Sequence, residues 1–195
     1  MPARLRRRAG ATLAAVAVAV AAGAGAAVTG CGAASDGGGP GSGLVFDPCA
    51  PLSLLLDPAA PAPRAGAVAT GAALWNDRAF TRLAVDSSGA ANLTGGAQVV
   101  LSFQRAAVAS HGLYDPAIAT IFLNVDLDGD AHALAVTVAH EVGHALGLPH
   151  VAPSRRPSVM NPGNLRVEPT SEDAAALEAL WGPCSPPAPP EGTPP

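Results

Sequence analysis

The sequence contains no lysine, and its cationic side chains are 11 arginines against 15 acidic residues. Four of the arginines lie within residues 1–30, which hold no acid, so the rest of the chain carries 7 basic and 15 acidic side chains and a net charge of −8. Such an acidic chain is poorly suited to nucleic acid or to an anionic membrane surface. The missing lysine also argues against a phosphate-binding loop in the Gly-rich stretch 32–43.

Cysteine is scarce, and the first of the three cysteines, Cys31, directly follows a basic and then apolar N-terminal stretch. Arg4 and three further arginines precede an uncharged Ala/Val-rich run over residues 9–28, and Gly30-Cys31 follows. This order is typical of a secretory signal peptide, and small residues before Cys31 resemble the bacterial lipobox, whose cysteine is lipidated. A signal peptide cleaved elsewhere and a retained signal anchor are the alternatives. We expect residues 1–30 to be a lipoprotein signal peptide and the protein to be lipid-anchored outside the cell membrane, or secreted if the lipobox is not used.

Two further segments have too few apolar side chains to join a core. Residues 31–43 are rich in Gly and Ser, and residues 183–195 contain seven prolines. We expect the first to be a flexible tether and the second a disordered tail. Residues 44–182 lie between them and are long enough for one domain with its own core, which we expect to be monomeric.

Hydrophobic patterning predicts an α+β fold for this domain. Apolar side chains at helical spacing indicate three helices, and short apolar or alternating runs indicate four strands. The predicted helices are 65–76, 131–146 and 171–181, and the predicted strands are 51–58, 83–85, 99–103 and 119–125. Trp75 is expected in the core, and Thr170 with Asp173 is expected to form a capping box at the start of the last helix.

The densest chemical signal is the stretch from His140 to His150, which reads HEVGHALGLPH. His140 and His144 are four residues apart, so a helix projects both from one face toward one metal ion. Gly147 can leave the helix with a positive φ and turn the chain so that His150 becomes a third ligand. Three imidazoles leave one tetrahedral position open, which is the catalytic pattern of zinc, and Glu141 is placed to act as a base toward water there.

The sequence SVMNP follows at residues 158–162. The long zinc motif followed by a methionine turn resembles the metzincin clan of zinc peptidases, and the wording of the turn is most similar to the matrixins. The resemblance implies a zincin fold, with a twisted mixed β-sheet packed on an active-site helix and a C-terminal helix. It also implies that Met160 supports the zinc site without binding the metal. One departure is visible: matrixins have two strands between the central strand and the active-site helix, and only 119–125 is predicted here.

An acidic segment, Asp126-Leu127-Asp128-Gly129-Asp130, precedes the predicted metal helix. Alternating aspartates can bind Ca²⁺, but an EF-hand loop that starts at Asp126 needs Glu at its twelfth position, where Thr137 stands. An acidic turn that favours the start of the helix is therefore the preferred interpretation, with calcium as the alternative. His111 and His132, on either side of this region, are expected to be surface histidines.

Cys49 and Cys184 lie at the two ends of the predicted domain. An exported protein meets oxidising conditions, so a disulfide between them is the preferred interpretation. The alternative is a cysteine switch, in which the Cys49 thiolate caps the zinc. The residues around Cys49 do not match the switch motif of the family, and Cys184 would then remain unpaired.

These observations together predict a zinc metalloendopeptidase that hydrolyses extracellular or cell-envelope polypeptides. In this hypothesis His140, His144 and His150 hold one Zn²⁺, and Glu141 is the catalytic base. A zinc amidase that acts on cell-wall material is the alternative enzyme. A lipoprotein that binds zinc without catalysis is the alternative outside the enzymes, although a purely structural zinc site has no use for Glu141.

Overall fold

The computed structural model describes residues 43–88, 96–107 and 110–185. The predicted signal peptide, Cys31, the tether and most of the Pro-rich tail lie outside the described residues. In the described ranges, no helix combines the length and the apolar character needed to cross a membrane.

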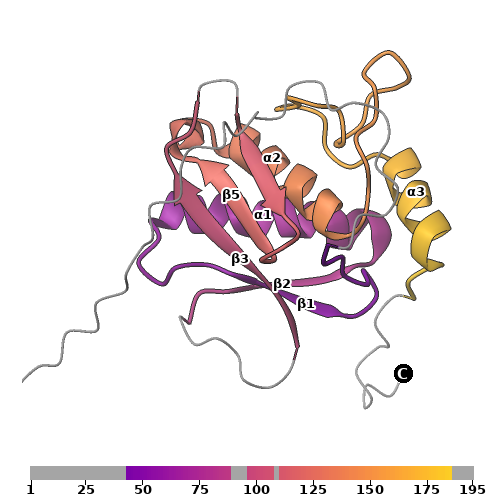
Figure 1. The fold of residues 1–195 in the computed structure, drawn as a ribbon, viewed down its shortest axis with the longest axis horizontal. Coiled ribbons are helices and arrows are strands. Elements are labelled where there is room, and N and C mark those ends of the chain that lie inside the picture. Colours follow the sequence, from indigo (N-terminus) through magenta and orange to yellow (C-terminus); the bar gives the residue numbers. More distant parts are fainter. Residues whose placement is uncertain (1–42, 89–95, 108–109, 186–195) are drawn as a thin grey trace, which may run out of the picture.

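The fold is α+β, built on one five-stranded mixed sheet with the strand order β2-β1-β3-β5-β4 (Figure 1). Three neighbouring pairs are parallel, and only β4 runs antiparallel to its neighbour β5. The parallel strands require crossover connections, which is why a helix follows β1 in the chain. The strands are β1 (Pro51–Leu55), β2 (Arg82–Asp86), β3 (Ala97–Gln104), β4 (Gly112–Asp115) and β5 (Thr120–Asn124).

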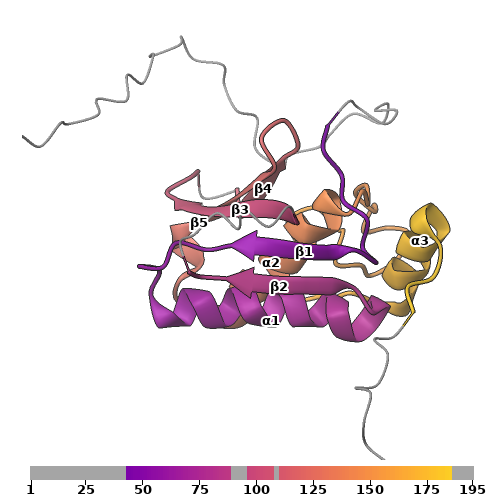
Figure 2. The same ribbon diagram turned by 90° about the horizontal axis from the view of Figure 1, so that it is seen from below.

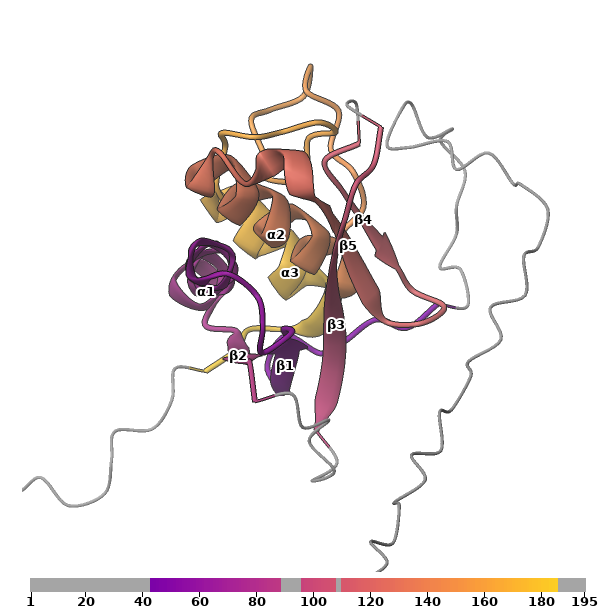
Figure 3. The same ribbon diagram turned by 90° about the vertical axis from the view of Figure 1, so that its left-hand side faces the viewer.

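Two long helices cover one face of the sheet, as the edge-on view in Figure 3 shows. They are α1 (Ala62–Ala79) and α2 (Ala131–Ala145), and they pack against each other as well as against the strands. Trp75 on α1 is fully buried, as predicted, and its indole N–H donates to the Ala139 carbonyl oxygen of α2 at 2.8 Å. This bond fixes α2 against α1 and so sets the position of the histidine-bearing helix.

The sequence-based prediction of a single strand before the metal helix is wrong, because β4 forms a second one. β4 is only four residues long, and two of its residues, Gly112 and Tyr114, are buried. Such a short alternation is a weak signal, and the strand is defined instead by its antiparallel pairing with β5. β4 is the edge strand of the sheet on the side of α2.

Local capping explains where α2 and the third helix begin. Asp130 caps α2 by accepting from the backbone N–H of Ala133 at 2.9 Å. The third helix, α3 (Ser171–Trp181), begins with the predicted capping box of Thr170 and Asp173, and Figure 2 shows it at one end of the strands.

A disulfide joins Cys49, just before β1, to Cys184, just after α3. This is the pairing that the sequence favoured over a cysteine switch. The bridge closes a loop with a sequence separation of 135 residues. In the chain-entropy account, closing so long a loop stabilises the folded domain by about 4–5 kcal/mol, and here it also ties the two ends of the domain together.

Candidate metal centre

Three imidazoles converge at the C-terminal end of α2. His140 and His144 project from the same face of the helix, and His150 is delivered by the chain that turns away from it. The turn uses Gly147, whose φ of 93° lies in the left-handed region that favours glycine. The structure therefore brings together the three histidines that the motif predicts as ligands.

Backbone carbonyls fix which ring nitrogen faces the centre. Nδ1 of His140 lies 2.6 Å from the Val159 carbonyl oxygen, and Nδ1 of His144 lies 2.8 Å from that of Leu148. A carbonyl oxygen only accepts, so Nδ1 must carry the proton in both rings. The Nε2 lone pairs of His140 and His144 are thereby left to face the centre, which is the arrangement that metal-binding histidines use.

Two of the three separations between Nε2 atoms match a tetrahedral zinc ion, and all three donor atoms lie within 4.8 Å of one another. Nε2 of His150 lies 3.3 Å from Nε2 of His140 and 3.1 Å from Nε2 of His144. With Zn–N bonds of about 2.0–2.1 Å, two ligands of a tetrahedral ion lie about 3.3–3.4 Å apart. Two inward-facing lone pairs this close repel each other unless a proton or a cation lies between them. The donor set and its geometry therefore fit a metal ion of the zinc type.

Burial keeps these rings neutral. It lowers the pKa of His140 to about 4 and the pKa of His144 to about 3, and it also lowers the pKa of His150. Protons therefore do not compete for the Nε2 atoms at neutral pH, and the site is ready to bind a cation.

Glu141 is the one buried acid of the motif. Its side chain is 2% exposed, and its Oε2 atom has no hydrogen-bond partner among the described residues. Burial raises the pKa of its carboxyl group to about 8, and the backbone N–H of Tyr114 on β4 offsets only part of that effect. A buried carboxyl group with one unpartnered oxygen is costly, so its placement beside three convergent imidazoles points to a role with a cation and a proton.

Met160 packs against α2, the helix that carries His140 and His144. It is 1% exposed, and a methyl group built on Gly143 would collide with its sulfur atom and crowd the ring of Trp75. Gly143, in the middle of the motif, therefore lets the methionine turn approach α2 closely. The side chain packs against the helix that carries His140 and His144, which is the supporting position expected for it.

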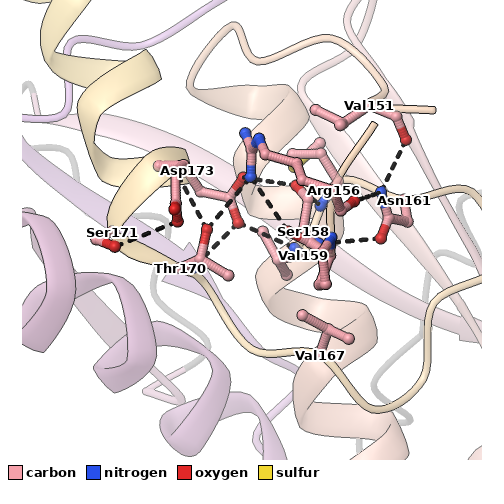
Figure 4. A network of polar contacts seen from close by, with 12 residues as sticks. Val151, Arg156, Ser158, Val159, Asn161, Val167, Thr170, Ser171 and Asp173 are labelled. Carbon is pink, nitrogen blue, oxygen red and sulfur yellow. Dashed lines mark hydrogen bonds and ion pairs between the residues drawn. The ribbon is translucent and has the colours of Figure 1, made fainter. Parts of the chain in front are cut away.

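The methionine turn is held by a residue whose role the sequence did not reveal, Asp173 of α3 (Figure 4). Its fully buried carboxylate accepts from the Ser158 hydroxyl at 2.5 Å, the Val159 N–H at 3.0 Å and the Arg156 guanidinium at 2.7 Å. Burial alone would raise the pKa of Asp173, but these donors and the Thr170 N–H outweigh it and lower the pKa. Val159 thus links Asp173 to His140, since its N–H donates to the acid and its carbonyl binds the imidazole.

The acidic segment before α2 does not form a second metal site in the described part of the chain. Each of its aspartates has an arginine partner instead: Asp126 with Arg105, Asp128 with Arg64 and Asp130 with Arg166. The histidine triad is the single potential metal-binding group found across the described ranges. The structure therefore favours the acidic-turn interpretation over calcium.

The other two histidines differ in their surroundings. The side chain of His132 is 46% exposed and lies 3.9 Å from Glu168, as expected for a surface residue. His111 is instead partly buried and lines a small cavity together with Glu141 and His140. His111 lies just before β4, a strand that was not predicted, and its placement could therefore not be predicted either.

Comparison with protein-family models finds no match for the chain, and comparison with curated proteins finds none either.

We expect the purified protein to bind one zinc ion per chain, because three neutral imidazoles converge and two of their Nε2 separations match those of a tetrahedral zinc ion. Loss of a hydrogen bond that supports a ligand lowers metal affinity about 10–100-fold. His150→Ala removes a ligand itself and should weaken zinc binding by more than this. His132→Ala, an exposed histidine outside the triad, is the matched control and should bind normally. Elemental analysis and competition with a chelator measure both. Equal affinities for the two variants would show that the triad is not the metal site.

Proposed function

We propose that this protein is a zinc-dependent endopeptidase of the metzincin type, with a matrixin-like catalytic domain. The observation that carries the proposal is Glu141, a buried carboxylate with an unpartnered oxygen next to three inward-facing imidazoles. The methionine turn, packed under the metal helix at Gly143, supports the same assignment. The fold adds an edge strand, β4, beside the site, where an extended chain can add to the sheet.

Each residue of the site has a distinct role in the proposed reaction. His140, His144 and His150 would hold the ion, which when bound acts as a Lewis acid and lowers the pKa of water. Glu141 accepts the proton of the attacking water and then donates it to the departing amine, so that one carboxyl group serves as base and acid in turn. Its raised pKa in the metal-free site means that the carboxyl group can hold a proton near neutral pH. Val159 and Leu148 keep the imidazoles oriented through their carbonyl groups.

Two alternatives make different demands on the site. A zinc protein without catalysis has no use for a buried base, and Glu141 therefore counts against it. An amidase of cell-wall material needs a surface for sugars, whereas the large cavity beside Glu141 is lined mainly by apolar side chains such as Leu113, Leu148 and Trp181. An edge strand and an apolar cavity together favour a polypeptide substrate.

The proposal is tested by incubating the zinc-loaded protein with a mixed peptide library and with purified cell-wall fragments, and by identifying products by mass spectrometry. We expect internal peptide bonds to be cleaved, cleavage to stop with a chelator, and activity to return when zinc is added. Release of cell-wall amide products without peptide cleavage would instead support the amidase. Export and lipidation at Cys31 remain predictions, which the mass of the mature N-terminus decides.

A further inference from the structure

Two cavities of very different size flank Glu141. On the side of His144 and His150 lies a cavity of about 830 Å³, and on the side of His140 lies one of about 20 Å³. Both are lined by Glu141, so both adjoin the proposed reaction centre. The larger one has room for a bulky side chain, while the smaller one holds no more than about one water molecule.

The walls of the large cavity come from the two ends of the domain. Val45 from the N-terminal segment and Leu180 and Trp181 from the end of α3 line it. A methyl group built on Gly147 would lie 3.9–4.0 Å from all three side chains, which shows that they converge beside the turn that delivers His150. Their exposed fractions are 50%, 56% and 38%, so the cavity presents apolar surface to solvent at the site.

These walls are held in place by bonds to the rest of the domain. The backbone N–H of Leu44 donates to the Pro116 carbonyl oxygen, just beyond β4, at 2.9 Å. The hydroxyl group of Tyr114 donates to the Leu44 carbonyl oxygen at 2.6 Å. The indole N–H of Trp181 donates to the Leu146 carbonyl oxygen at 2.9 Å. The walls are therefore fixed before a ligand arrives, and the disulfide between Cys49 and Cys184 ties their two segments together.

The direction of β4 indicates which cavity lies before the scissile bond of a bound peptide and which lies after it. β4 begins at Gly112, which lines the small cavity, and runs toward Pro116, which lines the large one. A peptide that adds to this edge in the more stable antiparallel sense runs the opposite way. Its residues before the scissile bond then lie at the large cavity, and those after the bond lie at the small one.

We propose that the large cavity is the main recognition pocket of this protein and takes an aromatic or large aliphatic side chain on the amino-terminal side of the bond that is cleaved. The small cavity admits only Gly or Ala on the carboxyl-terminal side. Val45, Leu180 and Trp181 determine this specificity. The inference rests on the proposed peptidase function, because it assigns the substrate class of the same site.

The first test is a set of peptides in which Phe, Leu or Ala is placed in turn at each position on either side of one cleavable bond. We expect kcat/KM to be about 10–100-fold higher with Phe or Leu than with Ala at one position before the bond. Directly after the bond the order should reverse, with Ala preferred. A preference for large apolar residues after the bond would overturn the proposal.

Two Val→Phe variants separate the cavity from a general effect of added bulk. Val45→Phe narrows the cavity and should lower the ratio of kcat/KM for the Phe peptide to that for the Ala peptide at least about tenfold. Val100→Phe, at a 43% exposed valine of β3 that lines neither cavity, is the matched control and should leave both unchanged. An unchanged preference in Val45→Phe contradicts the proposed role of this wall.

Binding can be followed without catalysis. The chain has two tryptophans, and Trp75 is fully buried, so a change of tryptophan fluorescence on ligand binding reports Trp181. Zinc-loaded Glu141→Gln protein, titrated with the Phe and Ala peptides, should give a shift only with the Phe peptide, and the shift should disappear in Trp181→Phe. A shift without peptide cleavage by the native protein would refute the peptidase function and retain the apolar pocket. Cleavage without a shift would refute the pocket alone.

Discussion

Glu141→Gln is expected to abolish peptide hydrolysis while leaving the metal in place. Glutamine keeps the shape of the side chain but cannot take a proton from water, and loss of a positioned acid–base group costs about 10²–10⁴-fold in rate. Zinc content should stay at one ion per chain, because the three imidazoles and their carbonyl partners are untouched. Cleavage of a peptide by metal-loaded protein, followed together with elemental analysis, measures both. Turnover at the native rate would remove Glu141 from the mechanism.

The same substitution should stabilise the metal-free protein, and this effect depends on pH. The pKa of Glu141 is raised from 4.5 to about 8 by burial, so its charged form is disfavoured in the folded state. Stability is therefore lost as the pH rises from 4.5 toward 8 and is retained below 4.5. Glutamine removes this penalty, and the free energy of unfolding should rise by about 3–5 kcal/mol at pH 8 and hardly at pH 4.

Thermal unfolding of chelated native and Glu141→Gln proteins at the two pH values measures this difference. Glu172→Gln, at an exposed acid of α3, is the control and should show no such gain at pH 8. Equal stability of native and Glu141→Gln proteins at pH 8 would contradict the stability cost assigned to the buried Glu141 carboxylate. Glu141→Gln is thus expected to lower activity and to raise stability. Such opposite effects are typical of residues whose unfavourable placement serves function.

The histidine triad could be predicted from the sequence because its geometry is local. His140 and His144 share a helix face through their spacing, and Gly147 marks the turn that brings in His150. The two long helices and four of the five strands follow from hydrophobic patterning for the same reason. β4 escaped prediction because it has four residues and is defined by its pairing with β5 rather than by its own pattern.

The large cavity could not be predicted, because its walls meet only in the folded domain. Val45 and Trp181 are separated in the sequence by almost the whole domain, and no local pattern predicts that their side chains meet. The supporting role of Asp173 was hidden in a similar way. Its capping box with Thr170 is a local pattern and was predicted, but its contacts with Ser158 and Val159 depend on how α3 packs against the methionine turn.

Asp173→Ala is expected to be among the most damaging substitutions outside the metal ligands. The carboxylate is fully buried and accepts from Arg156, Ser158, Val159 and the Thr170 N–H. Removing it leaves a partly buried guanidinium and buried donors without their acceptor, which costs about 3–5 kcal/mol in the free energy of unfolding. Denaturant unfolding measures this loss. Glu178→Ala on the same helix is the control, because the Glu178 side chain has no bonding partner among the described residues. It should lower the free energy of unfolding by less than about 0.5 kcal/mol.

Asp173→Asn separates the structural role from the effect on the metal. Asn keeps an acceptor oxygen for Ser158 or Val159 but loses the charge that Arg156 meets, so the domain should fold with reduced stability. Because Val159 also binds Nδ1 of His140, a shifted turn misorients that ligand, and zinc affinity should fall by about 10–100-fold. Chelator competition on the folded variant detects this change. Native zinc affinity in a destabilised Asp173→Asn protein would show that the turn supports the fold without orienting His140.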